Sequence, residues 1–305
     1  MTSINVLGVP HAYTLTPAVS SGQTLVFIHG WLLSRQYWQP VISQLSPDCQ
    51  CLTYDLRGFG NSTQCLHQRQ SPPADHSRFY SNASKSPFGL VAYALDLIEL
   101  LKQLELTQAW LVGHSLGGSI ALWAAHLAPE LIQGVIGVNV GGGIYLHEAF
   151  QRFRSAGQQI VNFRSPWLTR IPFLELAFSR MMVTVPVGKR WGKQRLLDLT
   201  LAQSEAALGA LLESTTEAEV HLLPQVVASL SQPVYFLAGQ QDRVMELKYV
   251  HHLASFHALF HQEAGNILEI SPCGHLAMVE QPQAVSHHIS QVLERHPSRP
   301  TRTVS

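Results

Sequence analysis

The sequence is poor in charged residues, since Asp, Glu, Lys and Arg together make up only 13% of its 305 residues. Its formal net charge at pH 7 is +0, which gives no reason to expect a nucleic-acid partner. Hydrophobic residues make up 46%, too many for a disordered chain and enough to fill a sizeable core. The length is that of one large domain or of a domain with an insertion.

Long apolar runs are also missing from this sequence. No stretch of about 18 residues is apolar throughout, so no membrane span is expected. The first residues, MTSIN, lack the basic segment and the apolar segment of a secretory leader. We therefore expect a cytoplasmic protein.

Cysteines and metal-binding patterns are scarce. Four cysteines are too few for a disulfide framework in a chain of this length, so we expect all four to be reduced and structural. The sixteen histidines invite a metal site, but the pattern HExxH is absent. No phosphate-binding glycine loop is complete either. We expect neither a metal nor a cofactor.

Buried strands alternate with helices along most of the chain. Continuous apolar runs typical of buried strands lie at residues 24–30, 51–56, 110–112, 134–140, 233–239 and 266–271. Helical periodicity is found between them, at residues 35–45, 88–106, 115–127, 243–256 and 275–294. This alternation predicts an α/β domain whose parallel sheet is covered by helices on both faces.

One segment interrupts the alternation, because residues 145–223 have helical patterns and no clear buried strand. An insertion at this point would lie over the strand ends, where α/β proteins bind their ligands. We therefore expect a core of residues 1–144 and 224–295, with a helical cap of residues 145–223. Residues 296–305 are polar and are expected to form a flexible tail.

A serine between glycines marks the point where the strand at 110–112 would pass directly into a helix. A residue at so sharp a turn adopts strained backbone angles, and small residues two before and two after it let the backbones pass. Gly113 and Gly117 occupy those positions around Ser115. The turn would expose the Ser115 hydroxyl and leave the N–H of Leu116 free at a helix N-terminus. The alternative is an ordinary strand–helix turn in which Ser115 is the N-cap.

A nucleophilic serine needs a base, and the base needs an acid to orient it, at the same end of the sheet. His275 follows the last expected strand, and Asp242 follows the strand at 233–239. The chain order Ser115, Asp242, His275 is that of nucleophile-elbow enzymes. Taken singly, Asp242 or His275 could instead cap the helix that follows it.

An oxyanion hole needs a second backbone donor from the loop after an early strand. The strand at 24–30 ends in His29 and Gly30, and the freedom of Gly30 lets the chain turn so that the Trp31 N–H points inward. We expect Trp31 and Leu116 to be the donor pair.

Substrate contacts are expected from residues beside the elbow and from the cap. The candidates are Gly30, His114, Trp167, Phe178 and Met182. The large apolar side chains of the cap could line a lipophilic pocket, or they could form the cap's own core. A basic cluster at residues 189–195 is either a solvated face or a point of peripheral contact with a membrane surface.

Five motifs in order, FIHGW, YDLRGFGNS, GHSLGGSIAL, LAGQQDRV and GHLAMVEQP, resemble the α/β-hydrolase superfamily in its capped, esterase-like branch. The resemblance runs from about residue 25 to about residue 292, with the cap as the exception. It implies a mostly parallel eight-stranded sheet with helices on both faces, a triad of Ser115, Asp242 and His275, and oxyanion donors at Trp31 and Leu116. Relatives of the haloalkane dehalogenase and epoxide hydrolase type have aspartate at the elbow, where this chain has serine.

The segments HGWLLSRQYWQP and GHSLGG are also similar to the succinyl-cyclohexadiene-carboxylate synthase family of menaquinone biosynthesis. That resemblance implies a lyase that uses the same triad for proton abstraction and elimination on a dicarboxylate in a small, basic pocket. Such a pocket would require basic cap residues, for which Arg152, Arg154 and Arg164 are the candidates. A slow-turnover ligand sensor that keeps the triad is the other alternative.

The residues together favour a serine hydrolase that needs no cofactor. We expect it to cleave a carboxylic ester or thioester of a fairly lipophilic small molecule through an acyl-enzyme.

Overall fold

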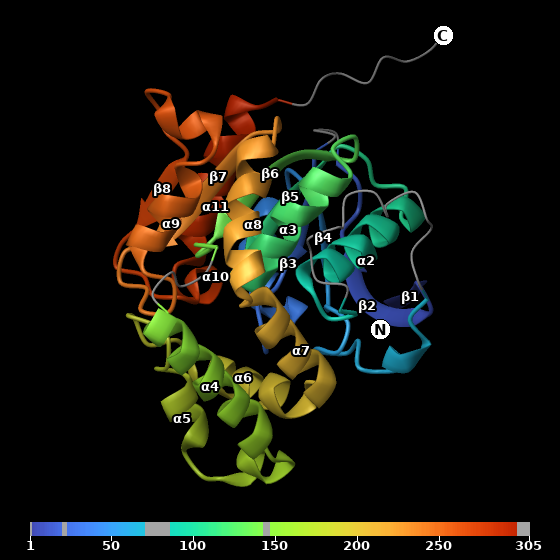
Figure 1. Ribbon diagram of the computed structural model, residues 1–305, viewed down its shortest axis with the longest axis vertical. Coiled ribbons are helices and arrows are strands. Elements are labelled where there is room, and N and C mark those ends of the chain that lie inside the picture. The colour runs from blue at the N-terminus through green and yellow to red at the C-terminus, as the bar shows by residue number, and fades with distance from the viewer. Residues whose placement is uncertain (1, 20–22, 71–85, 143–146, 298–305) are drawn as a thin grey trace.

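The computed structural model describes residues 2–19, 23–70, 86–142 and 147–297 (Figure 1). The expected boundary between core and cap, at residue 144, lies outside the described residues, and so do residues 298–305 of the expected tail.

Eight strands form one sheet in the order β1-β2-β4-β3-β5-β6-β7-β8. The strands are β1 (Thr2–Val6), β2 (Val9–Leu15), β3 (Thr24–Ile28), β4 (Gln50–Tyr54), β5 (Ala109–His114), β6 (Ile132–Val138), β7 (Val234–Gly239) and β8 (Ile267–Ile270). Strand β2 is antiparallel to both of its neighbours, and the pairs from β4 to β8 are parallel. The mostly parallel eight-stranded sheet expected from the resemblance is confirmed.

The central strands are buried on both faces, which explains why they appear in the sequence as continuous apolar runs. Every residue of β3, β5 and β7 is buried. Side chains alternate between the faces: Val26 and Ile28 belong to one hydrophobic core, and Leu25 and Phe27 belong to the other.

Helices cover both faces of the sheet, as expected. One core receives apolar side chains from α2 (Leu90–Gln103), α3 (Leu116–Leu127), α8 (Glu217–Ser229) and α9 (Leu247–Ala254). The other receives them from α1 (Gln39–Leu45), α10 (Ala277–Glu280), α11 (Pro282–Arg295) and the short 3-10 helix η1 (Arg35–Trp38). None of the described helices has the length and apolar composition needed to cross a membrane.

The segment between β6 and β7 is helical in its described part. It contains α4 (His147–Phe163), η4 (Pro166–Arg170), α5 (Leu174–Phe178), α6 (Lys189–Leu201), α7 (Ser204–Ser214) and α8. Figure 1 shows α4, α5 and α6 gathered beyond one end of the sheet, with α7 leading back toward the main body. Helix α8 packs against α3 in the main body. It begins inside the range expected for the cap, residues 145–223, and ends outside it at Ser229.

Candidate active site

Ser115 lies between the end of β5 and the start of α3, in a strained conformation. Its φ of 50° and ψ of −119° fall in a region that non-glycine residues rarely adopt. The Ser115 side chain makes no capping hydrogen bond to α3, which removes the alternative of an ordinary N-cap. The residue is only partly buried, and its hydroxyl has no hydrogen-bond partner among the described residues. The strained turn therefore holds a free hydroxyl at the surface of a cavity.

The two glycines of the turn have no room for a side chain. A Cβ on Gly117 would lie 2.4 Å from the carbonyl oxygen of Ile28 and 2.5 Å from that of His29. A Cβ on Gly113 would lie 2.3 Å from the carbonyl oxygen of Gly117. The start of α3 therefore packs directly against the backbone at the end of β3, as the sequence pattern predicts for a nucleophile elbow.

His275 and Asp242 form a buried pair. Nδ1 of His275 lies 2.7 Å from Oδ2 of Asp242, and both side chains are almost inaccessible to solvent. The other carboxylate oxygen, Oδ1, accepts hydrogen bonds from the backbone N–H groups of Val244 (2.8 Å) and Met245 (2.9 Å). Asp242 thus both closes the turn before α9 and fixes the imidazole. Because Nδ1 is occupied by the carboxylate, Nε2 is the ring nitrogen of His275 left for chemistry.

The loop that carries His275 is tied to neighbouring strand ends by residues whose role sequence reasoning missed. Asn139, directly after β6, donates from Nδ2 to the carbonyl oxygens of Gly274 (3.0 Å) and His275 (2.8 Å). Its Oδ1 accepts from the N–H of Gly239 (2.7 Å) at the end of β7. The sequence offered one indication of this role, namely a polar residue immediately after a buried apolar strand. Asn139 therefore sets the spacing between the Asp242 and His275 loops.

His114 is buried and contacts the loop that carries His275. Its Nε2 is 2.8 Å from the carbonyl oxygen of His275, and burial together with the nearby His275 lowers its pKa well below the usual value. The imidazole is therefore neutral and donates from Nε2. A Cβ on Gly30 would lie 2.6 Å from Nδ1 of His114, so this glycine makes room for the ring. Gly30 and His114, expected to contact substrate, do not line the cavity that contains Ser115. His114 holds the His275 loop, and Gly30 leaves space for the His114 ring.

Trp31 and Leu116, the expected oxyanion donors, are both partly or fully buried and border the cavity that contains Ser115. Neither backbone N–H group donates to a backbone acceptor among the described residues. The indole Nε1 of Trp31 donates to the carbonyl oxygen of Ala207 (2.8 Å), which anchors the side chain against α7.

A small, mainly apolar cavity of about 90 Å³ opens on Ser115. Its apolar walls come from the main body and from the inserted helices: Trp31, Leu90, Leu116, Val140, Phe153, Leu211, Leu223 and Met245. The polar lining residues are Ser115, Ser119, Ser214, Thr215 and Glu219. No lysine or arginine is among the described residues that line it.

The three cap residues expected to contact substrate do not line this cavity. Trp167 is 58% exposed, Met182 is 38% exposed, and Phe178 is half-buried under the guanidinium of Arg195. The backbone of Met182 does reach the site, because its carbonyl oxygen accepts from the N–H of His275 (2.9 Å). The segment therefore touches the site through its main chain.

The arginines proposed for a lyase pocket do not face the cavity either. Arg154 donates to the carbonyl oxygens of Leu212 and Thr215, and so fixes the C-terminus of α7. Arg164 donates to the carbonyl oxygen of Ala202, and Arg152 is exposed.

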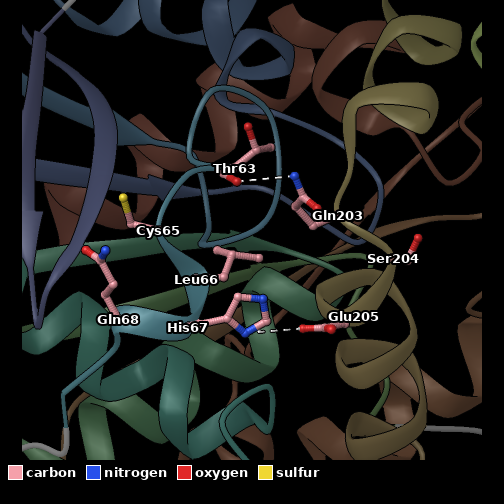
Figure 2. Close-up of a pocket in the computed structure, with 8 residues that line it drawn as sticks. All are labelled: Thr63, Cys65, Leu66, His67, Gln68, Gln203, Ser204 and Glu205. Atoms are coloured by element: carbon pink, nitrogen blue, oxygen red, sulfur yellow. Dashed lines mark hydrogen bonds and ion pairs between the residues drawn. The ribbon is translucent and has the colours of Figure 1, made fainter.

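A second, larger hollow of about 420 Å³ lies away from these residues (Figure 2). It is lined by the loop at residues 63–68 and by the start of α7, and its His67–Glu205 pair is solvent-exposed. None of Ser115, Asp242 and His275 borders it. Across the described part of the chain, no three His, Cys, Asp or Glu side chains are grouped in a way that could hold a metal ion.

Comparisons with known proteins identify the family to which this fold belongs. A family model described as "Alpha/beta hydrolase family" matches residues 25–287. The 2-succinyl-6-hydroxy-2,4-cyclohexadiene-1-carboxylate synthase of Salmonella heidelberg (strain SL476) is 29% identical over 288 residues, which cover 91% of this chain and 96% of that enzyme.

Solved structures share the fold at lower identity. A thermophilic esterase from Thermogutta terrifontis superposes with a TM-score of 0.72 at 20% identity, over 98% of this chain and all (100%) of that chain. The enol-lactonase from Burkholderia xenovorans LB400 superposes with a TM-score of 0.70 at 17% identity, over 96% of this chain and 100% of that chain. With the family model matched over most of its length, this chain belongs to the α/β hydrolase family.

Proposed function

We propose that the chain is a serine hydrolase that cleaves a carboxylic ester or thioester through an acyl-enzyme. The observation that carries this proposal is the strained, uncapped Ser115 on an apolar cavity, at the same sheet edge as the buried His275–Asp242 pair. These three residues are the nucleophile, the base and the orienting acid that acyl transfer requires.

In the proposed reaction, Nε2 of His275 removes the proton from the Ser115 hydroxyl as the oxygen attacks the acyl carbon. Asp242 holds the imidazole through Nδ1 and stabilises its charged form. The oxyanion accepts hydrogen bonds from the N–H groups of Leu116 and Trp31, each worth roughly 3–4 kcal/mol of barrier. His275 returns its proton to the leaving alcohol or thiol, and then activates the water that releases the acid. Ser115 does not hydrogen-bond to His275 in the free protein, and we expect that bond to form with substrate bound.

The acyl group belongs in the cavity beside Ser115, whose apolar walls favour a lipophilic chain. A volume of about 90 Å³ is small for a ligand site, so the structure favours a short acyl chain over a long one. The exposed apolar residues of the inserted helices, such as Trp167 and Phe173, lie outside this cavity.

The lyase reaction implied by the resemblance to the succinyl-cyclohexadiene-carboxylate synthases is the second candidate, and the 29% identity to the Salmonella synthase favours it. That synthase is named for a carboxylate compound, and a bound carboxylate is best held by positively charged side chains. The described lining of this cavity has no lysine or arginine and has Glu219 instead. This acidic lining supports ester hydrolysis over the lyase reaction.

Hydrolysis of a 4-nitrophenyl ester series from acetate to octanoate, by wild type and by Ser115→Ala, tests the proposal. We expect wild-type kcat/KM to exceed that of Ser115→Ala by at least about 1,000-fold, with the best substrate at four to six carbons. Equal rates for the two proteins would refute ester hydrolysis at Ser115.

A further inference from the structure

A buried carboxyl group lies in the cavity and takes no part in the proposed reaction. Glu219, in the first turn of α8, is 4% exposed and lines the cavity together with Ser115 and Ser119. Its Oε1 accepts a hydrogen bond from the indole Nε1 of Trp123 on α3. The other oxygen, Oε2, has no partner among the described residues.

The local sequence predicts that Glu219 caps the N-terminus of α8. Thr216 is the N-cap of α8 and accepts from the N–H of Glu219 (3.1 Å), which is half of a capping box. In a complete box the glutamate would reach back to the N–H of Thr216. Glu219 instead turns toward α3 and the cavity, so it does not complete the cap.

The hydrogen bond from Trp123 on α3 places Glu219 of α8 within reach of a bound acyl group. Ser115, Ser119 and Trp123 are four residues apart and therefore share one face of the helix. Four residues rise about 6 Å, and helical side chains lean toward the N-terminus, so the Trp123 indole leans back toward Ser119. Its partner Glu219 then lies roughly one helical turn from the acyl carbon on Ser115.

Among the described residues, no cation is paired with the Glu219 carboxyl group, whose pKa is set by burial, Trp123 and Glu213. The described lining of the cavity contains no lysine, arginine or histidine, and Glu219 is its one acidic residue. Arg154, whose guanidinium contacts the neighbouring Thr215, is engaged with backbone carbonyls. Burial raises the pKa of Glu219 to about 7, with a further increase from Glu213 and an opposing effect of the Trp123 hydrogen bond. Above pH 8 the cavity therefore holds a negative charge with one free acceptor oxygen.

We propose that Glu219 is a specificity-determining residue that favours acyl groups with a hydrogen-bond donor, such as a hydroxyl, and rejects acyl groups that carry a carboxylate. This inference rests on the proposed ester hydrolysis and names the substrate class of that site. A hydroxyl on the acyl chain donates to Oε2, which otherwise has no hydrogen-bond partner among the described residues. An acyl carboxylate roughly 6 Å from ionised Glu219 is repelled by it. At an effective dielectric constant near 20, this repulsion weakens binding of that acyl group on the order of 100-fold.

Three ethyl esters of similar size test the inference by kcat and KM at pH 8.5: ethyl butyrate, ethyl 3-hydroxybutyrate and monoethyl succinate. We expect wild type to prefer the hydroxybutyrate at least about 5-fold over the butyrate, and to use the succinate at least 30-fold less well. Glu219→Gln keeps an acceptor for Trp123 and removes the charge. It is expected to raise the succinate-to-butyrate ratio of kcat/KM by at least 30-fold, mainly through KM.

Glu217→Gln is the matched control, because it removes the same charge from an exposed position on the same helix and is expected to leave all three ratios unchanged. Glu219→Leu is expected to abolish the preference for the hydroxyl group. A succinate-to-butyrate ratio that changes less than 2-fold in folded Glu219→Gln would overturn the inference. If that variant does not fold, a wild type that uses succinate and butyrate equally well would overturn it.

Failure of the proposed function gives a different result, namely no ester hydrolysis above that of Ser115→Ala. In that event, binding of butyramide, 3-hydroxybutyramide and succinamate to Ser115→Ala is measured by isothermal titration calorimetry. We expect 3-hydroxybutyramide to bind best, and Glu219→Gln to strengthen succinamate binding by at least 30-fold. Equal binding of succinamate with and without Glu219→Gln would overturn the inference independently of catalysis.

Discussion

Asp198 is expected to lower the free energy of unfolding as pH rises, which is the opposite of the usual effect of a carboxylate. The residue lies in α6, is 2% exposed, and joins α6 to the main body. Its Oδ2 accepts from the Ser34 hydroxyl (3.0 Å), and its Oδ1 accepts from Nε2 of Gln194 (3.0 Å). Burial raises the pKa of Asp198 to about 7, although both hydrogen bonds act to lower it. The native state therefore keeps a proton that the unfolded chain releases above about pH 4.

The sign follows from proton linkage. Between about pH 4 and pH 7 the native state binds more protons at Asp198 than the unfolded state does, so the free energy of unfolding falls as pH rises. The difference between about 7 and the ordinary value of 3.8 is about 3 pH units. At about 1.36 kcal/mol per unit, ionisation of Asp198 costs the native state up to about 4 kcal/mol.

Asp198→Asn removes this cost and keeps acceptor and donor groups for Ser34 and Gln194. We expect its free energy of unfolding in guanidinium chloride to exceed that of wild type at pH 8 by about 2–4 kcal/mol, and to exceed it by much less at pH 5. Comparing the two proteins at each pH cancels other groups such as His29, whose pKa burial lowers and which acts in the opposite direction. Asp48→Asn, at an exposed carboxyl, is the control and is expected to show no such difference.

A variant-minus-wild-type difference that is the same at pH 5 and pH 8 would refute the argument. So would an Asp198→Asn protein whose destabilisation grows as pH rises, because it would mean that the charged carboxylate stabilises α6.

Two further variants test the catalytic geometry. Asp242→Asn keeps its turn but leaves His275 without an anionic partner, so we expect kcat for ester hydrolysis to fall about 10⁴-fold with little loss of stability; a loss below 10-fold would contradict this. Gly117→Ala places a Cβ 2.4 Å from the carbonyl oxygen of Ile28, so we expect about 1–3 kcal/mol of destabilisation and at least 10-fold lower kcat. Gly188→Ala, which meets nothing within 4 Å, is the control, and equal melting temperatures of the two glycine variants would be the contrary result.

The sheet and the positions of Ser115, Asp242 and His275 could be predicted from the sequence for one physical reason. Ser115 comes one residue after β5, Asp242 three after β7 and His275 five after β8, and parallel strands end at the same edge of a sheet. A residue a few positions beyond the end of one strand therefore lies near residues that follow the ends of the neighbouring strands. The helix expected at 275–294 is instead divided into α10 and α11. Pro282 has no backbone N–H with which to continue the hydrogen bonding of α10, and it begins α11.

Contacts made by helices of the insertion could not be predicted in this way. An apolar residue such as Trp167 or Phe178 can face the cavity, the insertion's own core or solvent, and only tertiary packing decides among them. Glu219 has the sequence context of a helix cap, and its role in the cavity depends on how α8 packs against α3. Asn139 likewise acts through residues about 100 and 135 positions further along the chain.

The most direct test of the central claim is to locate the acyl group by mass spectrometry in protein acid-quenched during turnover of 4-nitrophenyl butyrate. Acyl transfer through Ser115 predicts one butyryl group per chain on the peptide that contains this serine, and none in Ser115→Ala. A butyryl group on any other residue, or hydrolysis by Ser115→Ala at the wild-type rate, would contradict it.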